Sequence, residues 1–95
     1  MSIRSFKNEY AQTIFLGQDP GKGYPADAIR VARRKLVMLH AARQLSDLRR
    51  PPGNRLEALK HARAGQHSIR INDQLRICFV WTGSDAEQVE ISDYH

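Results

Sequence analysis

The sequence is poor in cysteine, since Cys78 is the only one among 95 residues. A single thiol excludes a disulfide within the chain and fits a reducing cytoplasm, and no spacing of cysteine and histidine resembles a zinc site. Long apolar runs are also missing, and none approaches the roughly 20 residues of a membrane-spanning helix. The first ten residues contain no apolar segment resembling a signal peptide. We therefore expect a cytoplasmic protein with no cofactor and no membrane partner.

Acidic residues are outnumbered by basic ones, and the net charge is +5. With 41% hydrophobic and 26% charged residues, the composition is that of a globular protein, and the length predicts a single domain over residues 1–95. Between residues 22 and 63, eleven lysines and arginines stand against three acids. This asymmetry indicates a basic face for nucleic acid or an acidic protein, although an ordinary solvated surface would also explain it.

Two helices are predicted in the first half of the chain, after a short strand over residues 2–6. Residues 7–16 place Tyr10 and Ile14 at helical spacing, and Gly17 follows as a stop. A longer helix begins at Pro25 and ends before the two prolines at 51 and 52. Its apolar stripe recurs at three and four residues and consists of Ile29, Ala32, Leu36, Leu39 and Ala42.

Basic side chains of the long helix lie off this apolar stripe. They are Arg30, Arg33, Arg34 and Lys35. A charged run of this kind is most often a solvated helix face, and it also suits an acidic protein partner. We take Arg30, Arg33 and Arg34 as the candidate contacts of such a partner.

The second half of the chain alternates polar and apolar residues, which is the pattern of half-buried strands. Strands are predicted at 67–71, 75–81 and 88–92 with short turns between them, so the sheet is an antiparallel meander. The predicted fold class is α+β. Two N-terminal helices pack on one face of a small antiparallel sheet, and the other face is exposed, basic and grooved.

The register of the first hairpin follows from its apolar residues. A three-residue loop at 72–74 sets Ile69 opposite Ile77 and keeps one face apolar, whereas a two-residue loop mixes the faces. The same register sets Arg70 opposite Arg76, and like charges facing each other are unfavourable in a sheet. Both side chains can splay into water, or an anion can lie between them. We favour the anion because Lys60 and His95 add further groups suited to a phosphate.

The last three residues, Asp93, Tyr94 and His95, combine an acid, a ring and an imidazole. Histidine suits proton transfer near neutral pH, a tyrosine ring stacks on bases, and the cations Lys60, Arg63, Arg70 and Arg76 can hold a phosphate. Together these groups match metal-free RNA cleavage, in which the 2′-hydroxyl attacks its own phosphate. From spacing alone, an ordinary frayed chain end would be the simpler interpretation.

Four segments carry a family resemblance: "IRSFK", "PPGNRLEALK" at 51–60, "RAGQHSIRINDQLRICFVW" at 63–81 and "VEISDYH" at the end. They resemble HigB-type toxins, the "killer protein" branch of the RelE/ParE toxin–antitoxin superfamily. The resemblance spans essentially the whole chain and implies a RelE-like fold. It also implies a ribosome-dependent mRNA endoribonuclease, silenced by a helix-turn-helix, HigA-like antitoxin and meeting operator DNA only through the antitoxin complex.

The resemblance also assigns residues. Carried over by position, the catalytic set is Lys60, Arg76, Asp93, Tyr94 and His95. Arg63, Arg70 and His67 are added as RNA-binding candidates. The acidic partner expected at Arg30, Arg33 and Arg34 becomes the antitoxin.

The match departs from the family pattern next to the lysine. The usual Gly-Asp-Arg run is replaced by His61-Ala62-Arg63, aromatic residues are replaced by His67 and Leu75, and Glu57 stands where some members have a histidine. His61 and His67 either take over acid–base work or reflect drift. Two alternatives follow. One is a ParE-like toxin of DNA gyrase, which would not need a terminal histidine, and the other is a catalytically weak co-repressor acting with its antitoxin.

Overall fold

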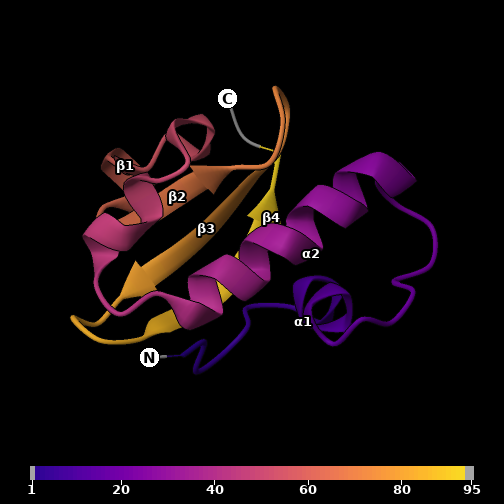
Figure 1. Cartoon of the computed structure of the whole chain (residues 1–95), viewed down its shortest axis with the longest axis horizontal. Helices are drawn as coiled ribbons and strands as arrows, with labels where there is room; N and C mark the ends of the chain where they lie inside the picture. The colour runs from indigo at the N-terminus through magenta and orange to yellow at the C-terminus, as the bar shows by residue number, and fades with distance from the viewer. Residues whose placement is uncertain (1, 94–95) are drawn as a thin grey trace.

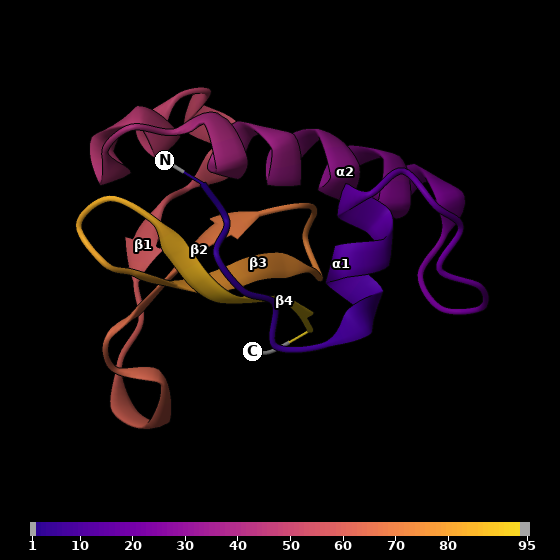
Figure 2. The same cartoon turned by 90° about the horizontal axis from the view of Figure 1, so that it is seen from below.

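The computed structural model describes residues 2–93 as a four-stranded sheet with two α-helices. The helices are α1 (Glu9–Phe15) and α2 (Ala26–Ala41), and the strands are β1 (Glu57–Ala58), β2 (Gln66–Arg70), β3 (Arg76–Trp81) and β4 (Ala86–Ser92). Short 3-10 turns, η1 (Leu45–Arg49), η2 (Pro52–Asn54) and η3 (His61–Arg63), punctuate the middle of the chain. Figure 1 shows α2 crossing the sheet, and Figure 2 shows it covering one face with α1 beside it. The predicted α+β fold is confirmed.

The sheet is an antiparallel meander in the order β1-β2-β3-β4. The predicted hairpin register is confirmed, because Ile69 pairs with Ile77 and Arg70 with Arg76. The side chain of Asn72 holds the turn, since its Oδ1 accepts hydrogen bonds from two backbone N–H groups at 2.8 Å. Strand β1 was not predicted, because a two-residue strand is too short to show any alternation.

The core lies between α2 and the inner face of the sheet. Its fully buried members include Leu36, Leu39, Ile69, Ile77 and Phe79. Each such side chain contributes about 1.5–3 kcal/mol when it is removed from water. The apolar stripe of α2 and the alternation of β2 and β3 are therefore the two halves of one core.

Helix α2 begins at Ala26, one residue after the predicted start at Pro25, which is its N-cap, and it ends at Ala41 rather than just before the prolines. The side chain of Asp47 explains the early end. Its Oδ2 accepts hydrogen bonds from the N–H groups of Arg43 at 2.9 Å and Gln44 at 3.2 Å. These bonds cap the separate 3-10 turn η1.

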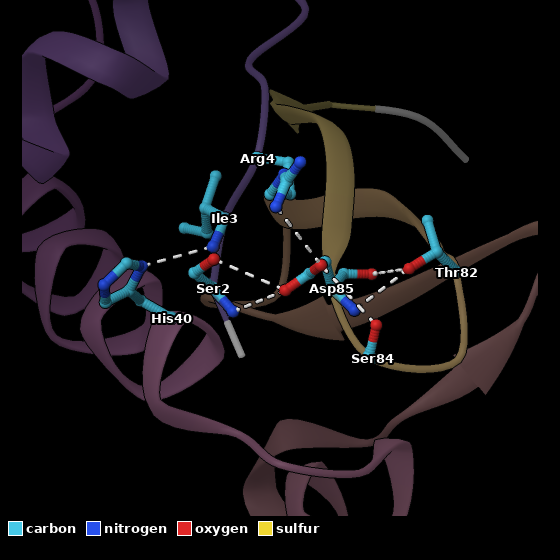
Figure 3. A network of polar contacts seen from close by, with 7 residues as sticks. All are labelled: Ser2, Ile3, Arg4, His40, Thr82, Ser84 and Asp85. Carbon is cyan, nitrogen blue, oxygen red and sulfur yellow. Dashed lines mark hydrogen bonds and ion pairs between the residues drawn. The ribbon is translucent and has the colours of Figure 1, made fainter.

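The N-terminal segment is fastened to β4 without forming a continuous strand. Residues 2–6 were predicted as a strand, but among the described residues they form only two isolated parallel bridges, Ile3 with Ala86 and Phe6 with Val89. Asp85 Oδ1 accepts a hydrogen bond from Ser2 N at 3.0 Å, as Figure 3 shows. The Ile3 N–H donates to Nδ1 of His40 on α2 at 3.2 Å. The segment thus joins β4 to α2.

The face of the sheet away from α2 is less exposed than the sequence predicts. Ser68 and Cys78 on this face are fully buried, and Glu90 is only 9% exposed. Arg63 covers part of it, since its guanidinium reaches Glu90 Oε2 at 3.2 Å. Within residues 2–93, no helix is long and apolar enough to cross a membrane.

Candidate active site

A groove of about 340 Å³ lies at the end of the β2–β3 hairpin. It brings together the side chains of Arg55, Glu57, Arg70, Asn72, Asp73, Gln74 and Arg76. Three guanidinium groups line a single groove of this size, as the facing arginines of the sequence suggest. Arginine forks match the geometry of phosphate oxygens, so the groove is suited to an oxyanion.

Arg76 is the best-anchored cation of the groove. Its Nε donates to Ser68 Oγ at 2.7 Å, and one terminal nitrogen donates to the backbone carbonyl of Arg55 at 2.6 Å. Glu57 lies 3.8 Å from the same Nε. Because the guanidinium is held on two sides, its orientation is fixed before any ligand arrives.

Arg55 was not predicted as a site residue. It follows the turn η2 in the left-handed conformation, with φ of 46°. The buried side chain of Asn54 holds this turn, since its Nδ2 donates to the carbonyls of Leu48 at 3.1 Å and Arg50 at 3.2 Å. No periodic pattern marks Arg55, because its place depends on an irregular segment packed by one asparagine.

The other side of the groove is formed by the hairpin turn and the end of β4. Arg70 forms an ion pair with Asp73. Gln74 Nε2 donates to Asp93 Oδ2 at 2.8 Å, which places the predicted Asp93 next to the groove. The predicted residues Tyr94 and His95 directly follow it in the chain and lie outside the described residues.

Lys60 and Arg63 are placed apart from the groove lining. Lys60 is exposed at the start of the turn η3. Arg63 donates to Gln66 Oε1, Glu90 Oε2 and Ser92 Oγ, each at 3.2 Å. The structure therefore uses Arg63 to join η3 to β4, across the face that carries Arg76.

His67 points to the opposite face of the sheet from Arg70 and Arg76. Its ring stacks on Phe79 with centroids 6.2 Å apart. It lines a second groove of about 400 Å³, which shares Arg55 and Glu57 with the first. Its Nδ1 is buried and has no hydrogen-bond partner among residues 2–93.

The basic residues of α2 have different surroundings. Arg30 pairs with Asp27 at 3.3 Å and is exposed, and Arg34 is exposed as well. Arg33 donates to the carbonyls of Ile14 at 2.9 Å and Gln18 at 3.3 Å, so it ties α2 to the end of α1. Lys35 was grouped with these arginines in the sequence analysis, but it is buried and only 6% exposed.

The groove has the groups to bind and polarise a phosphate. Its three arginines can balance the charge of a phosphate. The carboxylates of Glu57 and Asp73 also line the groove, and Asp93 lies beside it. Among residues 2–93, no cluster of three or more histidine, cysteine or acidic side chains is arranged to hold a metal ion.

Comparison with known proteins identifies the family of this chain. The model of a family described as "RelE-like toxin of type II toxin-antitoxin system HigB" matches residues 4–95. "Toxin HigB-1" of Vibrio cholerae serotype O1 is 38% identical over 76 residues, which cover 80% of each chain. An uncharacterized protein of Haemophilus influenzae is 28% identical over 94% of this chain and 88% of its own. The chain therefore belongs to the HigB-like family of RelE-like toxins of type II toxin–antitoxin systems.

Proposed function

We propose that this toxin is an endoribonuclease that cuts mRNA on the translating ribosome. The observation that carries the proposal is the facing pair Arg70 and Arg76, brought with Arg55 into one groove. Asp73 pairs with Arg70, and Glu57 lies 3.8 Å from Arg76, so two carboxylates offset part of the repulsion between the facing arginines. With Arg55 the lining still holds more cations than carboxylates, which favours a bound anion. The RNA backbone supplies a phosphate at every nucleotide, and the family of toxins to which the chain belongs makes a translated message the expected source.

The proposed reaction needs proton transfer and charge stabilisation but no metal. The 2′-oxygen attacks the adjacent phosphorus, its proton passes to a base, and the departing 5′-oxygen receives a proton from an acid. His95 is the proposed proton-transfer group, with Asp93 beside it in the chain. Arg76 and Lys60 stabilise the negative charge that grows on the phosphate oxygens, and Tyr94 stacks on a neighbouring base.

Binding of the message would rest mainly on phosphate contacts. Arg70 and Arg76 contact phosphate directly in this proposal, and Arg63 and His67 extend the surface toward η3 and the second groove. Affinity for ribosomes or RNA should therefore fall as the salt concentration rises, since each neutralised phosphate releases counterions.

A helix-turn-helix antitoxin of the HigA type is the proposed inhibitor, and operator DNA is reached through that complex. Its proposed contact is the basic side of α2, where Arg30 and Arg34 are exposed and Arg33 is half-buried. Because ribosomes are the target, the toxin would act in the cytoplasm.

The test is induction of the toxin in growing bacteria, followed by mapping of new mRNA 5′ ends. Cuts that cluster in frame within translated messages, and that vanish when translation initiation on one reporter is blocked, support the proposal. Loss of DNA supercoiling without new 5′ ends would instead indicate a gyrase toxin. A third outcome would indicate a co-repressor: growth and mRNA remain unchanged, but the toxin–antitoxin complex still alters binding to operator DNA. The departure from the family pattern at His61-Ala62 favours this alternative.

A further inference from the structure

Lys35 is a buried lysine that the proposed reaction does not use. It lies on α2, only 6% exposed. Its Nζ donates a hydrogen bond of 2.6 Å to the backbone carbonyl of Arg70, the last residue of β2. A lysine ammonium is costly to bury, so this position requires a specific reason.

An unpaired backbone carbonyl at the edge of the sheet partly explains why a lysine is buried here. Carbonyls of one strand point alternately to its two sides, and Gln66 O faces β1 because it accepts from Leu59 N. Arg70 O, four residues further on, faces the same side. The pairing of β1 begins at Glu57, opposite Ser68, so within residues 2–93 no residue of β1 lies opposite Arg70 O. The Lys35 ammonium takes the place of the missing strand donor.

The ammonium also adds a charge behind the groove. Burial lowers the pKa of Lys35, and nearby positive charges lower it further. Those charges belong to Arg34, Arg70 and Arg76. Two of these three arginines line the groove. Among residues 2–93, no carboxylate forms an ion pair with this ammonium, and the groove carboxylates Asp73 and Glu57 lie beside Arg70 and Arg76 instead. An anion bound in the groove would relieve the remaining repulsion.

We propose that Lys35 is a positioning residue of the anion groove, which fixes the backbone of Arg70 and raises the positive potential behind the phosphate. The Arg70 carbonyl is held from the core side, while the Arg70 side chain lies in the groove on the outer face. The identification of the anion as RNA phosphate rests on the proposed function, but the anion affinity itself does not. In this proposal a buried residue of the core, Lys35, increases the anion affinity of a groove on the surface.

The direct test is a titration of the folded protein with sulfate. The NMR signals of the Nε–H groups of Arg70 and Arg76 are monitored at each sulfate concentration to obtain the dissociation constant. Lys35→Met removes the charge and the donor but keeps a long side chain, and its sulfate dissociation constant should rise on the order of tenfold. Lys22→Met, in the exposed loop before α2, is the matched loss of one positive charge and should change little. Equal affinities of Lys35→Met and wild type would overturn the proposal.

A second comparison does not depend on the folding of Lys35→Met. Lys35→Arg keeps the positive charge at every pH used. Wild-type sulfate affinity should fall as pH rises through the lowered pKa of Lys35, whereas Lys35→Arg should retain it. The thiol of Cys78, with a pKa of about 11, titrates in wild type and in Lys35→Arg alike, so it does not contribute to the difference between their pH profiles. Parallel pH profiles would overturn the charge role.

Message cleavage is then measured on the same variants. If Lys35→Met weakens both sulfate binding and ribosome-dependent cleavage, with Lys35→Arg restoring both, Lys35 serves the proposed reaction. If sulfate binding depends on Lys35 while no variant, including wild type, cuts mRNA, then the proposed function fails and the groove remains an anion site. If the sulfate affinity does not depend on Lys35 while wild type still cuts mRNA, only the proposed role of Lys35 is refuted.

Discussion

The contact between Arg63 and Glu90 is expected to stabilise the fold measurably. Glu90 is almost fully buried, and its Oε2 lies 3.2 Å from Arg63 and 3.3 Å from Lys7. At 3.2 Å and an effective dielectric constant of about 20, the Coulomb attraction of such a pair is about 5 kcal/mol. Desolvation of both charges offsets a large part of this. We therefore expect a net coupling of about 1–3 kcal/mol.

The measurement is a double-mutant cycle in urea, with Arg63→Met, Glu90→Gln and the double variant. Arg63→Met alone should lower the free energy of unfolding by about 2–3 kcal/mol, because it leaves a buried carboxylate with Lys7 as its remaining cation. The double variant should lose less than the sum of the two single losses. A coupling under about 0.5 kcal/mol, the ordinary value for exposed pairs, would refute the inference that this contact holds η3 to β4.

Three further predictions concern other parts of the fold. Asn54→Ala should lower the free energy of unfolding by about 2–4 kcal/mol in urea, since two backbone carbonyls lose their donor and a cavity remains; a loss below about 1 kcal/mol would show that the turn does not depend on this side chain. Burial raises the pKa of the Cys78 thiol from 9.0 to about 11, so the folded state holds its proton longer than the unfolded state. The unfolding free energy should therefore decline from about pH 9 to pH 11, and this decline should be reduced in Cys78→Ala. Arg30→Glu with Arg34→Glu should weaken antitoxin binding and reverse its salt dependence, as measured by calorimetry, and unchanged affinity would place the antitoxin elsewhere.

The parts of the fold that could be predicted are those with a periodic signal. The register of the β2–β3 hairpin followed from one requirement, that Ile69 and Ile77 share a face, and this set Arg70 opposite Arg76. The start of α2 followed from the proline at 25. In each case the local sequence signal and the burial of apolar side chains in the core favour the same arrangement.

The parts that could not be predicted depend on single long-range contacts. Lys35 was grouped with the solvated arginines by its charge, yet it lies on the same helix face as Ala28, Ala32 and Leu39. A lysine can occupy such a position when its long stem carries the ammonium to a carbonyl, here that of Arg70. Sequence spacing does not reveal that carbonyl.

The candidate site divides in the same way. Arg70 and Arg76 were predicted to meet, and they do. Arg55 was missed because the turn before it has no repeating pattern, and the contact of Gln74 with Asp93 joins residues 19 apart. The roles of Lys60, Tyr94 and His95 remain predictions that rest on family resemblance.

The most direct measurement is the rate of mRNA cleavage in a purified translation system, with wild type compared with His95→Ala and Lys60→Ala. Circular dichroism confirms folding of each variant. Loss of a positioned proton-transfer group costs on the order of a hundred- to ten-thousand-fold in rate, so His95→Ala should cut far more slowly than wild type. The double variant should lose less than the two single losses combined, since both residues act on one step. Cleavage by His95→Ala at the wild-type rate would contradict the proposed nuclease mechanism, in which His95 transfers the proton.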